Sequence, residues 1–567
     1  MTLYAAGTAY GSGATSLGTA TTNGEGNFTV QYTPPGTPTV LYFVALGGNA
    51  GDGTNSAIGL MGIAGLSNAL PESVTINELT TVAAQWSLAQ FIDSTGQIIG
   101  SPSSNAVGFG NAVAQAIANL VDNSTGAPSS FWASQGVTEA SCTGGSPPVN
   151  CDGLERLNTI GNVLGACVQS SGPLSAACTT LLSETSSSTN TLQAARVIAT
   201  NPVANVTMLY ALQTDSSPFT PELSAAPDGF EIALSFDPSS SFDEPVFLAL
   251  DAAGNVWVPN GAGDNVTELS FAGSLIGNFA PAAADFDGSD GVAIDASGNV
   301  WVTNFTGDTV SELVAGCSTS SCTGHNFNPS GANFDAPFNI AIDAGGNAWI
   351  TNRDGNSVTE LTSSGALAGN FAPDAADFDF LQGVAIDATG NVWIGNTGEG
   401  TVVELNSSGG LVGAFSPAGA EFDEPAHVAF DASGNAWVTN IEGDTVSELL
   451  AGCTTESCTG LNFDPDGANF DTPAFVAMDA AGNAWVANED GDSVTELNSS
   501  GALVGNFTPP GADYDVPDGL ATDASGNVWV ANVESNTVAE LIGLARPVLT
   551  PQVACLKKTP AHAVCLP

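Results

Sequence analysis

The sequence has very few basic residues. Its 567 residues include six Lys and Arg and three His against 58 Asp and Glu, which gives a formal net charge of −52. Nucleic-acid binding needs clustered Lys and Arg to neutralise phosphates, so this composition excludes a nucleic-acid partner. It also disfavours docking on an anionic membrane surface, which attracts polybasic segments.

Long apolar runs are missing as well. No stretch of about 18 apolar residues occurs, so the sequence predicts no transmembrane segment. Residues 1–7 carry neither the basic nor the apolar segment of a secretory signal peptide, and we expect Met1 to lie within a longer precursor.

The ten Cys residues fall into five close pairs along the chain. None of the pairs has C-x-x-C spacing and His is scarce, which favours disulfides over thiolate metal sites. Because disulfides form in oxidising compartments, the sequence predicts a secreted or cell-surface protein. The predicted pairs are Cys142/Cys151, Cys167/Cys178, Cys317/Cys322, Cys453/Cys458 and Cys555/Cys565.

A repeat in the second half of the chain predicts the architecture. The string D-x-x-G-N-[VA]-W occurs seven times, with successive copies 44 or 48 residues apart. A period in the forties, built of short alternating segments, is typical of four-stranded propeller blades. The two longer units each contain a Cys pair, which we expect to close the tip of a lengthened hairpin. The copies begin at Asp251, Asp295, Asp343, Asp387, Asp431, Asp479 and Asp523.

The last repeat lacks a clear fourth strand of its own. Residues 230–236, upstream of the first repeat, resemble the fourth strand expected at 503–507, and both segments precede the same kind of acidic loop. A strand supplied from upstream would close the ring without leaving a free edge. The sequence therefore predicts a seven-bladed ring that its own upstream segment completes.

The repeat unit P-x-x-[VIL]-A-[IFLMT]-D-x-x-G-N-x-W-[VI]-x-N-x-x-x-[DN]-x-V-x-E-L resembles the NHL repeat. Among enzymes it is most similar to the virginiamycin B lyases, which are seven-bladed propellers. The likeness covers residues 228–546 and implies a propeller fold. It implies no particular activity, because this scaffold hosts many unrelated ones.

The first part of the chain changes character near residue 48. Strand-like runs before it, among them 27–32, resemble the later strands of a carboxypeptidase-regulatory or Cna-B-like sandwich. From residue 75 the apolar period becomes helical. The expected fold is mainly β, with a partial β-sandwich over 1–47, a disulfide-containing α-helical module over 48–227, a seven-bladed β-propeller over 228–546 and a C-terminal tail over 547–567.

Each repeat carries an aromatic–Asp pair in the loop before its innermost strand. Seven ring-related carboxylates would make one face strongly negative and would suit Ca²⁺, since hard cations prefer carboxylate oxygen. Alternatively, each Asp caps its own turn through backbone N–H groups while the aromatic packs between blades. The aspartates are Asp243, Asp287, Asp335, Asp379, Asp423, Asp471 and Asp515.

Positions that differ among the copies are better candidates for a specific site than positions that repeat. The residues at the start of the innermost strands vary, and we expect them to line the mouth of the central channel. Their mixture of polar and aromatic side chains would suit a small ligand. These residues are Asp290, Phe338, Asn339, Gln382, His427, Phe475 and Asp518.

The resemblance to the virginiamycin B lyases implies a catalytic His in a P-H-x-I context, a Glu on a neighbouring blade and Mg²⁺. Only the segment 425–428, P-A-H-V, approaches that context, and its His stands one position late, which would alter its facing in a strand. His427 is the candidate catalytic residue on this basis.

Most polar side chains recur in all seven copies, whereas catalysis would single out one or two. The sequence therefore predicts a monomeric, non-catalytic propeller scaffold, secreted or on the cell surface, that binds a protein, a glycan or a small ligand and that Ca²⁺ would stabilise. The alternative is a lyase or lactonase like virginiamycin B lyase, acting at the channel mouth with a divalent metal.

Overall fold

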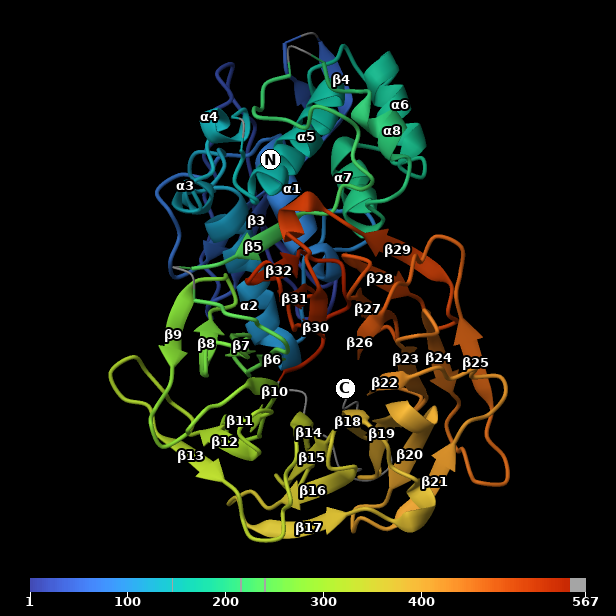
Figure 1. Cartoon of the computed structure of the whole chain (residues 1–567). Coiled ribbons are helices and arrows are strands. Elements are labelled where there is room, and N and C mark those ends of the chain that lie inside the picture. The colour runs from blue at the N-terminus through green and yellow to red at the C-terminus, as the bar shows by residue number, and fades with distance from the viewer. Residues whose placement is uncertain (52, 145, 215–216, 239–240, 551–567) are drawn as a thin grey trace.

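The structure is a computed structural model that describes residues 1–51, 53–144, 146–214, 217–238 and 241–550. Seven four-stranded antiparallel sheets form a ring around a channel, and helices with one further four-stranded sheet adjoin the ring on one side (Figure 1). The fold is mainly β, and the predicted seven-bladed propeller is confirmed. The predicted pair Cys555/Cys565 lies outside the described residues.

Each blade is a meander whose first strand lies innermost. The blades, numbered in chain order, are blade 1 with β6 (Ala249–Leu250), β7 (Val256–Asn260), β8 (Asn265–Leu269) and β9 (Leu275–Phe279); blade 2 with β10 (Ser289–Ile294), β11 (Val300–Asn304), β12 (Thr309–Leu313) and β13 (Gly324–Phe327); blade 3 with β14 (Pro337–Ile342), β15 (Ala348–Asn352), β16 (Ser357–Leu361) and β17 (Leu367–Phe371); blade 4 with β18 (Leu381–Ile386), β19 (Val392–Asn396), β20 (Thr401–Leu405) and β21 (Leu411–Phe415); blade 5 with β22 (Pro425–Phe430), β23 (Ala436–Asn440), β24 (Thr445–Leu449) and β25 (Gly460–Phe463); blade 6 with β26 (Pro473–Met478), β27 (Ala484–Asn488), β28 (Ser493–Leu497) and β29 (Leu503–Phe507); and blade 7 with β30 (Pro517–Thr522), β31 (Val528–Asn532), β32 (Thr537–Leu541) and β5 (Ala233–Phe236).

The predicted closure of the ring is confirmed in blade 7. Strand β5, from upstream of the first repeat, pairs antiparallel with β32, and Phe236 stands opposite Val538. In every blade the repeat Trp stacks on a Phe of the outermost strand, with ring centroids 5.3 to 5.7 Å apart. In blade 7 that Phe is Phe236, stacked on Trp529. The upstream segment therefore supplies both the missing hydrogen bonds and the missing ring.

The Asp of D-x-x-G-N shapes the hairpin between the first and second strands. In blade 2, Asp295 Oδ1 accepts hydrogen bonds from the backbone N–H groups of Ser297 (2.8 Å) and Asn299 (2.9 Å). Gly298 has φ of 84°, the left-handed conformation that glycine adopts without a steric penalty. The repeated Asp is thus a turn residue, and the turn sets the register of the two inner strands.

The N-terminal sheet is larger than the sequence predicts. Its strands pair in the order β2-β1-β3-β4. Residues 54–66, expected in the helical module, complete this sheet, and the predicted boundary at residue 47 falls inside β3. Both faces of β4 are buried, so its apolar residues do not alternate with polar ones. The alternation that would predict a strand is therefore missing from the sequence. The bounds are β1 (Thr2–Ala5), β2 (Thr15–Thr19), β3 (Val40–Asn49) and β4 (Thr54–Leu66).

Residues 27–32, predicted as a strand, pair with no other strand in the part of the chain that the structure describes. Their alternating apolar side chains Val30 and Tyr32 pack on the buried cluster of the N-terminal sheet, and the ring of Phe28 meets Phe43 of β3 edge-on at 5.3 Å. The segment therefore covers a face of the sheet instead of extending its edge.

The helical segment follows the N-terminal sheet. Its elements are α1 (Glu78–Ser87), η1 (Ala89–Phe91), η2 (Ser103–Asn105), α2 (Ala106–Gln115), η3 (Ala116–Leu120), α3 (Ser130–Ser134), α4 (Glu139–Cys142), α5 (Cys151–Val168), α6 (Ala176–Glu184), α7 (Thr191–Thr200) and α8 (Val206–Tyr210). Disulfides Cys142–Cys151 and Cys167–Cys178 join α4 to α5 and α5 to α6. No helix in the described part of the chain is both long enough and apolar enough to cross a membrane.

The two remaining described disulfides close hairpin tips, as predicted. Cys317–Cys322 lies between β12 and β13, and Cys453–Cys458 lies between β24 and β25. All eight Cys of the described residues are therefore paired as the sequence predicts, and this pairing indicates an oxidising, extracytoplasmic location.

The helical segment and the propeller share one hydrophobic core. A single cluster of buried side chains contains Met61 of β4, Trp86 of α1 and Trp529 of blade 7. Polar side chains reinforce the contact, and Gln115 Nε2 donates to Glu540 Oε1 at 2.6 Å. Trp86 Nε1 also donates to the carbonyl of Phe230, 2.9 Å away, just upstream of β5.

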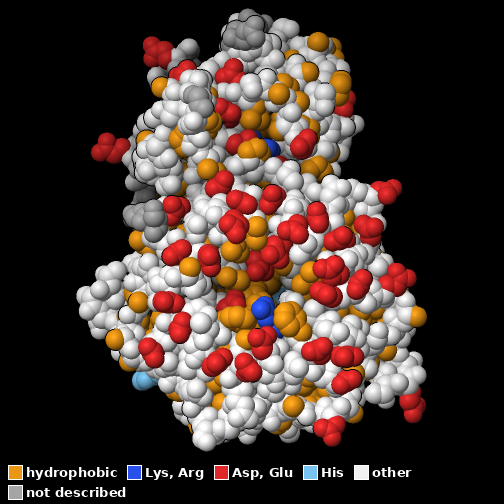
Figure 2. Space-filling model, in the orientation of Figure 1, with side chains coloured by type: hydrophobic (Ala, Val, Ile, Leu, Met, Phe, Trp, Pro, Cys, Tyr) orange, Lys and Arg blue, Asp and Glu red, His pale blue; other side chains and the backbone are white. Residues whose placement is uncertain are grey.

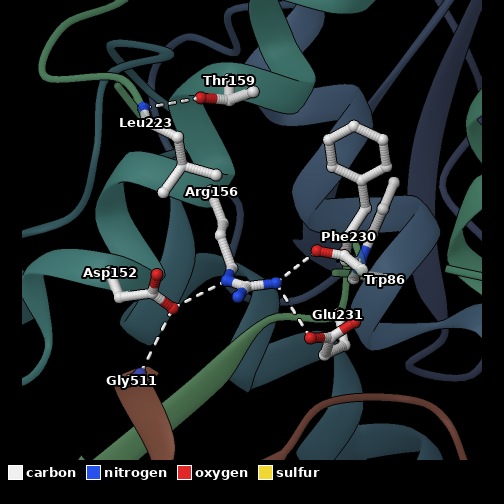
Figure 3. Close-up of polar contacts among 9 residues, drawn as sticks. Trp86, Asp152, Arg156, Thr159, Leu223, Phe230, Glu231 and Gly511 are labelled. Atoms are coloured by element: carbon white, nitrogen blue, oxygen red, sulfur yellow. Dashed lines mark hydrogen bonds and ion pairs between the residues drawn. The ribbon is translucent and has the colours of Figure 1, made fainter. Parts of the chain in front are cut away.

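A buried ion-pair network ties α5 to the closing strand (Figure 3). Arg156 Nε lies 2.7 Å from Asp152 Oδ2, and its Nη1 lies 2.9 Å from Glu231 Oε1. Arg156 also donates to the carbonyl of Gly229. Asp152 Oδ2 in turn accepts from the backbone N–H of Gly511 in η6 (Pro510–Ala512), before β30. The network therefore links the helices, the segment leading into β5 and the last blade.

Candidate ligand site at the channel mouth

The loops that lead into the innermost strands are fixed by the neighbouring blade. In blade 2 the turn between the second and third strands ends on Asp308, whose Oδ1 accepts the backbone N–H of Ala336 at 2.9 Å, in the loop before β14. Six hydrogen bonds of this kind join neighbouring blades around the ring. In blade 4 the residue at the position of Asp308 is Gly400, which has no side chain to accept one. The donors are Gly288, Ala336, Phe380, Thr472, Val516 and Glu244, and the acceptors in the same order are Asp264, Asp308, Asn356, Asp444, Asp492 and Asn536.

The predicted mouth residues occupy two levels of the channel. Asn339, His427 and Phe475, with Phe247 before β6, line a cavity of about 730 Å³ among the Val, Ile and Ala side chains of the innermost strands. The cavity extends to the D-x-x-G-N turns at the opposite end, where Thr550 lines it. The other four predicted residues do not line this cavity and lie at the outer starts of their strands: Asp290, Phe338, Gln382 and Asp518.

Three phenyl rings separate the two levels. The ring of Phe247, from blade 1, lies 5.5 Å from that of Phe338 in blade 3 and 5.6 Å from that of Phe475 in blade 6. Rings from three different blades thus meet across the channel. We call the rings of Phe247, Phe338 and Phe475 the aromatic floor. The outer level, above this floor, is the channel mouth.

Arg353 lies over aromatic rings of this mouth and was not among the predicted site residues. Its guanidinium carbon is 4.6 Å from the ring centre of Phe305, 5.1 Å from that of Phe338 and 4.7 Å from that of Phe380. Such contacts of a cation with aromatic faces are favourable and fix the plane of the guanidinium. Figure 2 shows a basic side chain at the centre of the ring, flanked by hydrophobic side chains and surrounded by acidic ones.

The signal that marks Arg353 is present in the sequence. It occupies the position just after the second strand, where the seven copies carry different residues, and blade 6 has Glu489 there. The rule that varying positions mark a site, applied to the starts of the first strands, holds equally at the ends of the second strands. These residues are Gly261, Phe305, Arg353, Thr397, Ile441, Glu489 and Val533.

Burial raises the pKa of two carboxyl groups at the mouth. Asp290 is 8% exposed, its Oδ1 has no hydrogen-bond partner among the described residues, and desolvation raises its pKa to about 8 although Arg353 acts in the opposite direction. Burial, followed by the charges of Glu489 and Asp290, raises the pKa of Asp518 well above its usual value. At neutral pH the mouth therefore carries a guanidinium cation beside the protonated carboxyl group of Asp290.

His427 faces the cavity below the aromatic floor. Its ring stacks on Phe475 with centroids 3.6 Å apart, and its Nδ1 has no hydrogen-bond partner among the described residues. Desolvation lowers the pKa of His427 to about 3, and a hydrogen bond with the backbone of Val476 only partly opposes this shift. The imidazole is thus neutral at physiological pH and is a weak base.

The seven aspartates of the aromatic–Asp pairs are all exposed and lie one per blade around the ring. The backbone carbonyls of five of them accept a backbone N–H from the turn of the same blade, as Asp287 does from Gly307 at 3.1 Å; the five are Asp243, Asp287, Asp335, Asp379 and Asp515. Phe334 packs between blades 2 and 3, as the alternative interpretation expects of the aromatic. Within the described ranges no three His, Cys, Asp or Glu side chains form a group that could hold a metal ion.

Seven four-stranded blades around a channel define this part of the chain as a β-propeller. No protein-family model and no curated protein matches the chain. Among solved structures it is similar to virginiamycin B lyase from Staphylococcus aureus, at 14% identity and a TM-score of 0.45 over 55% of this chain and 98% of that one. It is also similar to a streptogramin B lyase (14%, 0.46, 55% and 97%) and to a putative 6-phosphogluconolactonase from Bacteroides fragilis (18%, 0.40, 53% and 91%). These similarities concern the propeller fold.

Proposed function

We propose that the protein is an extracytoplasmic propeller that binds a small organic ligand at its channel mouth without transforming it. The observation that carries the proposal is the outer level of the channel, where buried polar atoms without partners stand above an aromatic floor. Asp290 Oδ1 and Arg353 Nε are both buried atoms, and neither has a hydrogen-bond partner among the described residues. Buried polar groups are normally satisfied, so a ligand that supplies their partners would gain free energy there.

Several features of the mouth suit a small ligand. Phe380 is 39% exposed beside the half-buried Gln382, so the mouth presents both apolar surface and an amide to an incoming molecule. Sites for small molecules combine aromatic walls with a few placed polar groups. The disulfides and the ring closure make the scaffold rigid, and a rigid site loses little entropy on binding.

A fragment screen on the full chain tests the proposal. Gln382→Trp places a bulky ring at the mouth, whereas Val412→Trp places the same ring on β21, the outer strand of the same blade, where Val412 is 41% exposed. Saturation-transfer NMR should find fragments whose signals vanish with Gln382→Trp and persist with Val412→Trp. If both variants bind every fragment as the parent does, the mouth is not the binding site and the proposal fails.

The alternative, a lyase or lactonase, has one observation in its favour. The neutral His427 with its free Nδ1 lines a cavity large enough for a small substrate. Its pKa of about 3 makes it a poor general base, because an effective base has a pKa near the working pH. Turnover of a lactone or cyclic depsipeptide by the parent, lost in His427→Ala, would replace the binding proposal with this one.

A further inference from the structure

We infer that the channel mouth recognises a carboxylate on a small ligand with an apolar body, and that the Arg353 guanidinium is the partner of that carboxylate. The inference rests on the proposed function and names the chemical class of the ligand. It makes an anion the ligand of a chain whose net charge is −52, which the composition alone would not suggest.

The first argument is that the guanidinium is held in place and makes no hydrogen bond within the described residues. The rings of Phe305, Phe338 and Phe380 hold the guanidinium. Its Nε nevertheless has no hydrogen-bond partner among the described residues. The nearest carboxylate oxygen in an ion pair with it, Oδ1 of Asp354, is 3.9 Å away on a side chain that is 57% exposed. Arg presents five N–H donors in a planar fork that matches a carboxylate, so a guanidinium that is held in place with donors free of hydrogen bonds can receive one.

The second argument is that the buried carboxyl group beside Arg353 does not neutralise it. Asp290 forms no ion pair with it within the described residues, and desolvation keeps the pKa of Asp290 near 8. The other basic residues of the described chain are elsewhere: Arg156 and Arg196 lie within the helical segment, and Arg546 follows the last blade next to Asp479. The mouth therefore holds a positive charge whose ion pair within the described residues is the 3.9 Å contact with the exposed Asp354, on an otherwise acidic face.

The third argument restricts the ligand to a small monocarboxylate. The aromatic floor and Phe380 offer apolar surface beside the guanidinium, which suits an aromatic or aliphatic body. The exposed aspartates around the ring repel polyanions at longer range, whereas one carboxylate in contact with Arg353 is favoured by direct, charge-assisted hydrogen bonds.

The Asp290 carboxyl makes this recognition sensitive to pH. The charge of Arg353, in the β15–β16 turn, lowers the pKa of Asp290. Asp518 on β30 lies near Asp290, and the charges of Glu489, in the β27–β28 turn, and of Asp290 raise the pKa of Asp518. The strands β6, β7, β11 and β14, packed against β10, contain no titratable side chain. Above pH 8 Asp290 becomes an anion beside Arg353, so it competes with the ligand carboxylate and affinity falls as pH rises.

Isothermal titration of the full chain with three matched probes tests the inference. The probes are 3-phenylpropanoate, 3-phenylpropanamide and 3-phenylpropylammonium, which share one body and differ in charge. At pH 7 we expect the carboxylate to bind at least about tenfold more tightly than the amide, since hydrogen bonds to a charged group contribute more than neutral ones. Between pH 7 and 9 the carboxylate should lose affinity, and Asp290→Asn should remove that loss.

Two Arg variants assign the effect. Arg353→Gln should reduce carboxylate binding to the level of the amide. Arg546→Gln, which replaces an exposed Arg at the other end of the propeller, should leave the affinity for both probes unchanged. Circular dichroism melts confirm that each variant is folded. Equal binding of carboxylate and amide, preference for the ammonium probe, or no binding of any probe overturns the inference. The fragment screen with Gln382→Trp judges the proposed function separately.

Discussion

A chain that begins at residue 240 is expected to lose cooperative unfolding. It lacks β5, whose four residues pair with β32 from Val538 to Leu541. Without them β32 becomes an unpaired edge, and Trp529 loses the ring of Phe236. Urea or thermal denaturation followed by circular dichroism measures the loss. A transition that matches the parent's in midpoint and steepness would contradict closure by the upstream strand.

A second truncation separates the strand from the helical segment. A chain that begins at residue 228 keeps β5 but lacks the helices, so it closes the ring while it exposes the face of blade 7 that packs in the shared core. We expect it to unfold cooperatively at a lower midpoint than the parent. If it behaves like the chain that begins at residue 240, the helical cover rather than the strand decides folding.

Phe236→Ala examines the closure within the full chain. Phe236 is 1% exposed, and removal of a buried Phe typically costs about 3–5 kcal/mol of the free energy of unfolding. Phe415→Ala, at the same position in blade 4, is the matched control because its ring stacks on Trp393 in the same way. Equal losses would mean that the closing blade is as firmly packed as one built from a continuous segment.

The repetition explains why most of the propeller could be predicted. Seven copies of one pattern give seven independent indications of the same strands and turns, so an irregular copy such as the last one is easily noticed. The closing strand was visible because Phe236 and its loop repeat a pattern found in each blade. Cys317–Cys322 and Cys453–Cys458 were visible for the same reason, since each accompanies an insertion into a regular unit.

The features that were missed depend on contacts between segments that share no pattern. Arg353 becomes a site residue only because Phe305, Phe338 and Phe380 come from a turn, a strand start and a loop of three consecutive blades. The sequence of β4 shows neither the period of a helix nor the alternation of a half-buried strand, because both faces of β4 are buried. The spacing of residues in the sequence does not predict which side chains from different blades meet. The residue at the position of Arg353 does differ among the seven copies, and this variation marks the position as unusual.

The helical segment packs closely against the last blade of the propeller. Asn105 Nδ2 donates to the carbonyl of Ala524 at 2.8 Å, and Gln90 Nε2 donates to that of Gly543 at 2.9 Å. Both acceptors lie in blade 7 or just after it. The side chains of the helices thus satisfy backbone groups of the last blade, and the closing strand is held from two sides.

Arg156→Met is expected to destabilise the whole chain by about 3–5 kcal/mol in urea denaturation at pH 7. The guanidinium is 3% exposed and pairs with Asp152 and Glu231, so its removal leaves a buried carboxylate without a counter-charge. Arg546→Met, which removes an exposed Arg, is the control and should change stability by less than about 0.5 kcal/mol. Equal effects of the two variants would mean that the network contributes nothing to stability.

The pH dependence of this loss identifies its cause. Burial raises the pKa of Glu231 even in the presence of Arg156, which acts in the opposite direction, so without Arg156 the pKa rises further. A carboxyl whose pKa is higher in the folded than in the unfolded protein favours folding at low pH and loses that contribution as pH rises. The stability deficit of Arg156→Met should therefore be small near pH 5 and grow towards pH 8. Adding Glu231→Gln should abolish the growth, because the amide that remains cannot ionise. A deficit that is constant with pH would assign the loss to packing of the Arg156 stem instead of to the buried charge.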